Sequence, residues 1–140
     1  MSAGAGIRHS EANAHDVPAK LFQIWLAPRV KGGKPNWGTK PFPKADRAGR
    51  FVVLASGFAE DADALSIRTD ARVSGASLQR GMEISYPLAA DRKAYLVPAL
   101  GRVIVNGLEI RSRDGVAILD EPVIHITALE DAELVLVETT

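Results

Sequence analysis

Cysteine is absent from the 140 residues of this chain, which excludes disulfide bonds and thiolate metal ligands. We expect a reducing, cytoplasmic location. The N-terminus has no basic cluster leading into an apolar run, so it is unlike a secretory signal. No stretch approaches the roughly 18 uninterrupted apolar residues of a membrane-spanning helix. We therefore expect no association with a membrane.

An excess of one charge sign is also missing, because 17 Lys and Arg residues balance 17 Asp and Glu residues. That balance argues against nucleic acid as the main partner. The charges are nevertheless segregated: positions 29–50 hold seven bases and one acid, and positions 120–138 hold six acids and no Lys or Arg. We expect the basic segment to pack across the folded domain, with its charges solvated or facing the acidic strands.

Helical periodicity is the third absence, since apolar residues recur with a period close to two almost everywhere. Residues 28–50 are rich in Gly, Pro and Lys and predict an extended arm. Elsewhere, turn signals such as Asn106-Gly107 and Asp114-Gly115 separate short β-rich segments, which predicts a sandwich or barrel in one compact domain. The predicted strands are residues 20–26, 50–55, 64–69, 72–78, 93–98, 102–106, 115–119, 123–128 and 132–137.

Three blocks of sequence are distinctive. They are residues 1–13 with Gly-Ile-Arg-His-Ser-Glu, residues 21–28 with Gln-Ile-Trp and the following Lys34-Pro35, and residues 101–107 with Asp114-Gly115 and Asp120-Glu121. These blocks resemble the pirin family, the bicupin proteins that include bacterial quercetinases, and the similarity runs over essentially the whole chain. The resemblance implies an all-β fold: a cupin double-stranded β-helix, or jelly-roll-like barrel, with an N-terminal strand or arm extension.

The same resemblance implies how the chain is divided. In the family, the Met-Ser-Ala-Gly block follows most of a first barrel. We therefore expect residues 1–50 to be remnant strands of that barrel plus the linking arm, and residues 51–140 to be the C-terminal pirin-type barrel. Trp25 and Leu96 should face a barrel interior. Without the first barrel, Trp37, Phe42 and the apolar face of residues 21–26 lose cover, which predicts a homodimer or docking on a protein partner.

His9 and Glu11 are the candidate metal ligands. On a strand, residues two apart point to one face, and an imidazole beside a carboxylate suits Fe(II) or another divalent first-row metal. The family combines a His-x-His pair from an earlier strand with a His-x-Glu pair, and His9 and Glu11 match the latter. Glu11 is also the candidate catalytic residue. No His-x-His occurs in this chain, so the pair is half of a site.

The remaining histidines are weaker candidates. His15 lies in a polar stretch, where a solvated loop residue is expected. His125 is flanked by Ile124 and Ile126, which occupy the opposite face of a strand. Residues 82–89 and 116–119 carry no histidine where a metal-binding cupin would offer one, so we expect an apolar, structural interior in the second barrel.

Two functions follow. The favoured one is a short pirin-like form without a complete metal centre, acting as a structural or binding cupin module that self-associates or docks on a partner. The alternative is an iron-dependent quercetin 2,3-dioxygenase-like oxidoreductase acting on a small aromatic substrate. Its metal site would then be completed by another chain or by a missing N-terminal segment. The cofactor would be Fe(II) or another divalent metal in the second case, and none in the first.

Overall fold

The computed structural model describes all residues, 1–140, and all ten strands lie in the second part of the chain. The sole helix is a short 3-10 helix, η1 (Lys44–Arg47), and no helix is long and apolar enough to span a membrane. The all-β prediction is confirmed. The strands are β1 (Val52–Ser56), β2 (Leu65–Ser66), β3 (Ala71–Leu78), β4 (Glu83–Pro87), β5 (Lys93–Leu100), β6 (Arg102–Val105), β7 (Leu108–Arg111), β8 (Val116–Ile118), β9 (Val123–Ala128) and β10 (Ala132–Thr139).

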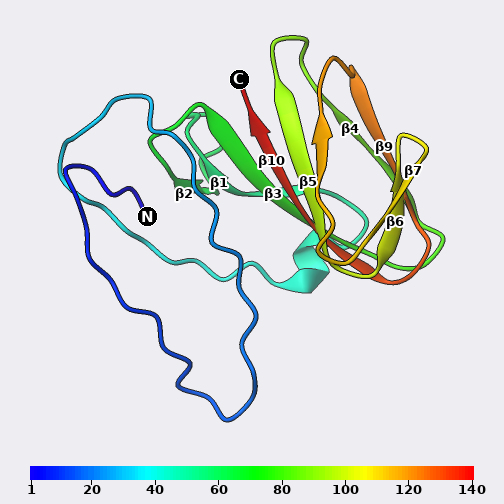
Figure 1. The fold of residues 1–140 in the computed structure, drawn as a ribbon, viewed down its shortest axis with the longest axis horizontal. Coiled ribbons are helices and arrows are strands. Elements are labelled where there is room, and N and C mark those ends of the chain that lie inside the picture. The colour runs from blue at the N-terminus through cyan, green and yellow to red at the C-terminus, as the bar shows by residue number, and fades with distance from the viewer.

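The strands form two facing sheets, which together we call the sandwich. One sheet has six strands in the order β2-β1-β3-β10-β5-β8, and the other has four in the order β4-β9-β6-β7. Every pairing is antiparallel except that of β1 with β2. Figure 1 shows β3, β10 and β5 running together beside the smaller sheet. The two sheets are not closed into a continuous barrel.

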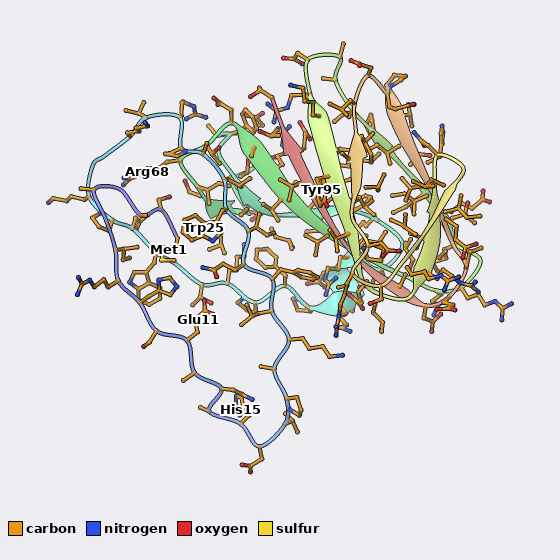
Figure 2. All side chains as sticks on the ribbon, in the orientation of Figure 1. Met1, Glu11, His15, Trp25, Arg68 and Tyr95 are labelled. Carbon is orange, nitrogen blue, oxygen red and sulfur yellow. The ribbon has the colours of Figure 1, made fainter.

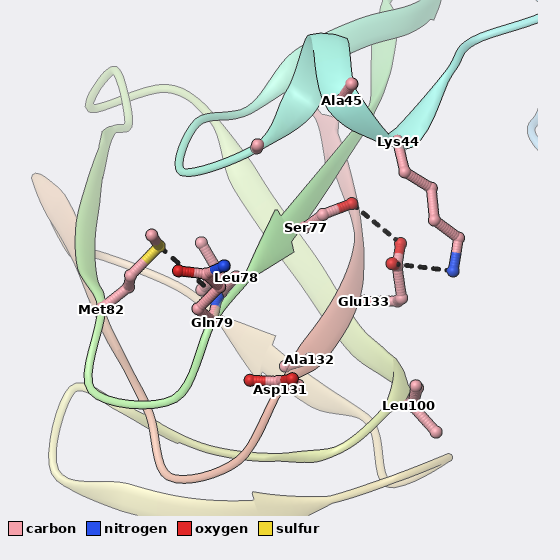
Figure 3. A pocket seen from close by; sticks show the side chains of 11 residues that line it. Lys44, Ala45, Ser77, Leu78, Gln79, Met82, Leu100, Asp131, Ala132 and Glu133 are labelled. Atoms are coloured by element: carbon pink, nitrogen blue, oxygen red, sulfur yellow. Dashed lines mark hydrogen bonds and ion pairs between the residues drawn. The ribbon is translucent and has the colours of Figure 1, made fainter.

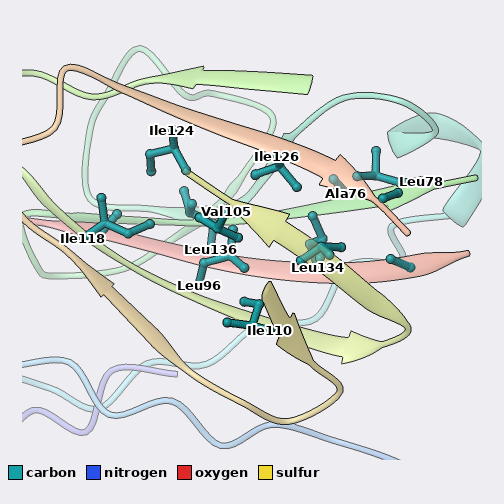
Figure 4. Packing of buried hydrophobic residues seen from close by; sticks show 14 of the residues in the cluster. Ala76, Leu78, Leu96, Val105, Ile110, Ile118, Ile124, Ile126, Leu134 and Leu136 are labelled. Carbon is teal, nitrogen blue, oxygen red and sulfur yellow. The ribbon is translucent and has the colours of Figure 1, made fainter. Parts of the chain in front are cut away.

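Apolar side chains fill the space between the sheets because the strands alternate between inward and outward residues. Along β10, buried and half-buried positions alternate over all eight residues. Figure 4 shows Leu134 and Leu136 of β10 in the same layer as Ile124 and Ile126 of β9. Leu96 has no exposed surface, so its expected interior position is confirmed. Each fully buried Leu or Ile stabilises the fold by roughly 1.5–3 kcal/mol.

The Asn106-Gly107 turn joins β6 to β7 as a two-residue hairpin. Both residues have positive φ, 45° and 86°, which is the backbone that such tight turns require. The hairpin contains a strand, β7, that the sequence pattern did not predict, and β4 was missed as well. In both β4 and β7 the inward and outward residues alternate. The outward residues are polar or exposed and each strand is short, so the apolar pattern is weak.

Residues 1–43, which we call the arm, contain no strand. In Figure 1 they form a wide open loop beside β1 and β2. No backbone–backbone hydrogen bond involves residues 7–28. The prediction of a strand over residues 20–26 is therefore wrong, because a strand needs a hydrogen-bonded neighbour and this chain supplies none there. Trp25 is 86% exposed, so its expected interior position is wrong for the same reason.

Only a few contacts hold the arm against the sandwich. The Arg29 amide donates to the carbonyl of Arg68 at 2.8 Å, and the Arg29 side chain donates to Asp70 at 2.7 Å. Just beyond the arm, Arg47 of η1, in the same basic segment, pairs with Glu133 of β10 at 2.7 Å. The last contact agrees with the expectation that the basic segment faces the acidic strands.

Candidate functional site

His9 and Glu11 lie together on the arm, although not on a strand. Their Nε2 and Oε1 atoms are 3.7 Å apart, which is too long for a hydrogen bond. Two ligands that each bind one first-row ion at about 2.0–2.2 Å are separated by no more than about 4.4 Å. The two atoms can therefore reach a common metal ion. Both side chains are substantially exposed, so such an ion would be open to solvent and to further ligands.

No third ligand stands beside this pair. The structure contains no group of three or more His, Cys, Asp or Glu side chains that could hold a metal ion. Figure 2 shows His15 near the far tip of the arm, well separated from Glu11. Its backbone amide donates to Asn13 at 3.2 Å within a local turn. The residues present fit two positions of a metal's coordination sphere, and the other ligands would have to come from elsewhere.

His125 is on the outer surface of the four-stranded sheet. Its Nδ1 is 3.0 Å from the hydroxyl oxygen of Ser85 on the neighbouring strand β4, and its backbone amide donates to Asn106 at 2.7 Å. Ile124 and Ile126, on either side of it, are buried. This placement matches the expected strand histidine, and it directs the imidazole away from the interior of the sandwich.

One end of the interior is charged, which corrects the expectation of a wholly apolar interior. Arg72 and Ser74 of β3 share the inward face with Leu78, and Arg72 lies directly opposite Glu138 of β10. Tyr86 of β4 and Arg92 of the β4–β5 turn complete this layer. We call it the polar end, and it consists of Arg72, Ser74, Tyr86, Arg92 and Glu138.

Glu138 is the centre of the polar end and is almost fully buried. It accepts hydrogen bonds from the Tyr86 hydroxyl and, at 2.9 Å, from Nε of Arg92, while a guanidinium nitrogen of Arg72 lies 3.6 Å away. Burial, followed by the hydrogen bond and the charge of Glu138, raises the pKa of Tyr86 well above its usual value. The tyrosine therefore remains a neutral hydrogen-bond donor.

Asp61 extends this network into the loop after β1. Burial raises the pKa of its carboxyl group, but hydrogen bonds from Ser56 and Arg72 and the charge of Arg72 outweigh that effect, so the pKa is lowered overall. The Ser56 hydroxyl donates to Asp61 at 2.5 Å and Nε of Arg72 donates at 2.6 Å. The loop is thus fixed to β3 by an ionised carboxylate.

Sequence reasoning missed the polar end. It counted Glu138 only as one of the six acids at positions 120–138. The signal that could have revealed it is the alternation itself, because Glu138 is two residues beyond Leu136 and Arg72 is two residues before Ser74. What the pattern does not contain is the partner, Arg92, 46 positions away.

An open hollow lies at the opposite end, between η1 and the ends of β3 and β10 (Figure 3). Glu133 within it accepts from Lys44 at 3.0 Å, Arg47 at 2.7 Å and Ser77 at 3.0 Å. Burial raises the pKa of Glu133, but these three partners lower it by more. Asp131 in turn accepts from the backbone amide of Arg80 at 2.8 Å. Both acids of the hollow therefore have hydrogen-bonding partners within the chain.

Two facing, mainly antiparallel sheets around an apolar core, preceded by an extended arm with a His-x-Glu pair, are consistent with a cupin-type protein. Residues 53–139 match the domain family described as the quercetinase C-terminal cupin domain. The chain belongs to the pirin family. The predicted family and cupin fold are confirmed.

Individual relatives agree with this assignment. The chain is 62% identical over 138 residues to a pirin-like protein of Caulobacter vibrioides, covering 99% of this chain and 60% of that one. It is 34% identical over 137 residues to a quercetin 2,3-dioxygenase of Escherichia coli K12, covering 97% and 58%. The chain therefore spans at most 60% of the length of these two relatives.

Solved structures show the same fold. The structure of YhhW from Escherichia coli superposes with a TM-score of 0.75 and 27% identity, covering 83% of this chain and 48% of that one. A second structure, the bacterial pirin YhhW in complex with nickel(II), gives a TM-score of 0.72 and 26% identity, covering 80% and 47%. A divalent metal is thus present in one similar pirin.

Proposed function

We propose that this chain is a binding module of the pirin type, in which the sandwich is structural and the arm binds a second copy of the chain or another protein. The observation that carries the proposal is the apolar surface of the arm. Its large apolar side chains are exposed together, where an isolated domain would bury them. These residues are Val17, Leu21, Phe22, Ile24, Trp25, Val30 and Trp37.

The backbone of the arm supports the same proposal. Residues 20–26 are β-rich, yet their amides and carbonyls make no backbone hydrogen bond within the chain. In an extended conformation, Leu21 and Trp25 share one face and Phe22 and Ile24 share the other. A segment that is apolar on both faces suits a strand covered on both sides. Pairing with the open edge of a partner's sheet would satisfy the backbone and bury these side chains.

The sandwich offers little space for a reaction. Its centre is filled by fully buried Leu and Ile side chains, and the charges of its polar end are paired with one another. These features favour a structural role for residues 51–140.

Analytical ultracentrifugation over a range of concentrations tests the binding role. The chain should self-associate, and Trp25→Ser should raise the dissociation constant about tenfold or more, because buried aromatic anchors dominate interfaces. Leu108→Ser is the matched control, since Leu108 is also exposed but lies on β7. A chain that stays monomeric and binds no partner through the arm, or a Trp25→Ser variant that behaves as the control does, would contradict the proposal.

A second candidate function is metal-dependent oxidation of a phenolic substrate, favoured by the 3.7 Å separation of His9 and Glu11 and by the names of the relatives. His9 would hold the ion through its neutral imidazole and Glu11 through its carboxylate. A bound Fe(II) or similar ion would supply the redox and Lewis-acid chemistry. Glu11 would also accept a proton from a phenolic hydroxyl group. The other ligands would come from another chain or from a further N-terminal segment.

Metal titration by calorimetry, followed by oxygen uptake with quercetin, distinguishes the two functions. If the second function holds, a divalent ion such as nickel(II) should bind stoichiometrically and be lost in His9→Ala. His15→Ala is the control and should retain it, because His15 lies apart from the pair. Absence of both binding and uptake would mean that this chain does not form the metal centre alone or by self-association.

A further inference from the structure

Residues 57–64, which we call the cap loop, leave β1 and lie beside the polar end. The backbone hydrogen bonds within this loop are local turns, from the Asp61 amide to Phe58 and from the Ala64 amide to Asp61. Gly57 at the start of the loop is held to β3 by its amide, which donates to the Ala71 carbonyl at 3.1 Å. The rest of the loop is attached to β3 by side chains, because Arg72 donates to Asp61 at 2.6 Å and to Glu60 at 2.8 Å. Residues 58–64 can therefore move away from β3 without breaking a backbone hydrogen bond to that strand.

The cap loop presents an aromatic ring to the same arginine that binds its carboxylates. The guanidinium carbon of Arg72 is 4.5 Å from the centroid of the Phe58 ring, and that of Arg92 is 5.1 Å from it. Guanidinium groups at such distances attract the face of a ring. Phe58 and Asp61 thus supply an aromatic ring and a carboxylate to one pair of arginines.

The hydroxyl group of Ser74 is buried in the polar end with one polar neighbour. Ser74 has no exposed surface and is on the inward face of β3. Its Oγ lies close enough to the Tyr86 hydroxyl to lower the pKa of that group, and it has no other polar partner. A hydroxyl group has one donor and two acceptor lone pairs, so Ser74 can still accept a hydrogen bond.

We propose that the polar end is a binding site for a small hydroxylated aromatic carboxylic acid and that the cap loop closes it as an internal mimic of that ligand. The carboxylate of the ligand replaces Asp61 on Arg72. Its ring replaces Phe58 beside Arg72 and Arg92, and its hydroxyl group pairs with Ser74. Arg29 and Lys40 of the arm donate to the carbonyls of Gly57 and Asp63 in the cap loop. The proposal needs no partner bound to the arm and no metal, so it can be tested separately from the proposed function.

Titration of the full chain with 4-hydroxybenzoate, followed by amide NMR shifts, tests this site. Saturable shifts should appear in the cap loop and around Ser74. Phe58→Ala should tighten the apparent affinity about fivefold or more, because it raises the fraction of molecules with an open site. Tyr95→Ala is the control, since that ring is half exposed on the outward face of β5, away from the cap loop, and its removal should leave the affinity unchanged. Phe58→Leu keeps an apolar side chain over the arginines but removes the ring. It is a second variant for use if Phe58→Ala lowers the melting temperature too far for the titration.

Two comparisons separate this site from general binding of anions. Cyclohexanecarboxylate, which has the charge without the ring, should bind clearly more weakly than benzoate. Ser74→Ala should weaken 4-hydroxybenzoate but leave benzoate unchanged. The proposal is overturned if a folded Phe58 variant shows no saturable shift, if the ring makes no difference to affinity, or if the Phe58 variants bind no more tightly than the wild type. The polar end would then be an ion cluster that only closes the sandwich.

Discussion

The arm and the sandwich use the same kind of sequence and reach opposite outcomes. Both contain β-rich apolar segments, but Leu96 of the sandwich is completely buried and Trp25 of the arm is 86% exposed. The difference is one of neighbours, since β5 is paired with β10 and β8 while residues 20–26 have no pairing. The alternating pattern indicates the tendency to form a strand. Burial requires a second element that completes the sheet.

The sharpest test of this comparison is a charge placed at each position. Leu96→Asp should unfold the sandwich, because an unpaired carboxylate in an apolar core costs more than about 4 kcal/mol. Trp25→Asp should change the stability of the isolated chain by less than about 0.5 kcal/mol. Thermal melting followed by circular dichroism measures both. Comparable loss in the two variants would mean that the arm is part of the folded core.

The polar end provides the next largest effect. Glu138→Ala leaves Arg92 without its carboxylate partner and Tyr86 without its acceptor. Breaking a buried ion pair on one side costs about 3–5 kcal/mol. Glu109→Ala is the control, because its pair with Arg102 is exposed and such pairs contribute about 0–1 kcal/mol. Urea denaturation compares the two variants, and equal losses would show that the polar end contributes little to stability.

The fold was largely predictable from sequence, and the polar end was not. The predicted strand over residues 123–128 matches β9 residue for residue, and β3, β5 and β10 differ only at their ends. Alternation and turn residues are local, so they are readable from one segment. The burial of Glu138 depends on Arg92, which is distant in the sequence, and no local pattern contains that information. The His9–Glu11 pair could be found from sequence because its members are two residues apart. A further ligand from a distant segment or another chain would leave no such local pattern.

The pH dependence of stability should separate the contribution of Asp61 in the cap loop from that of Tyr86 in the polar end. The lowered pKa of Asp61 means that its contribution is present above the unfolded value near 4 and is lost as the pH falls through the folded value. The raised pKa of Tyr86 means that its contribution is present below the unfolded value near 10 and is lost as the pH rises beyond it.

Two variants test whether Asp61 and Tyr86 cause the losses of stability in acid and in alkali. Asp61→Asn should flatten the loss of stability in acid, and Tyr86→Phe should flatten the loss in alkali. Melting temperatures measured from about pH 3 to pH 11 span both unfolded pKa values. If Asp61→Asn leaves the acid loss of stability unchanged and Tyr86→Phe leaves the alkaline loss unchanged, other groups set the pH range over which the fold is stable.

The smallest expected effect concerns the attachment of the arm. Arg29→Gln removes the ion pair with Asp70 and the contact with the Gly57 carbonyl, but leaves the backbone bond from Arg29 to Arg68. Exposed ion pairs contribute little, so the melting temperature should stay the same. Amide hydrogen exchange at position 29 should become faster by a few-fold, because local opening of the arm no longer breaks the ion pair. Lys31→Gln, which alters the same segment without removing an ion pair, is the control. A fall in melting temperature approaching that of Glu138→Ala would mean that arm and sandwich unfold as one unit, and the contrast between them would no longer hold.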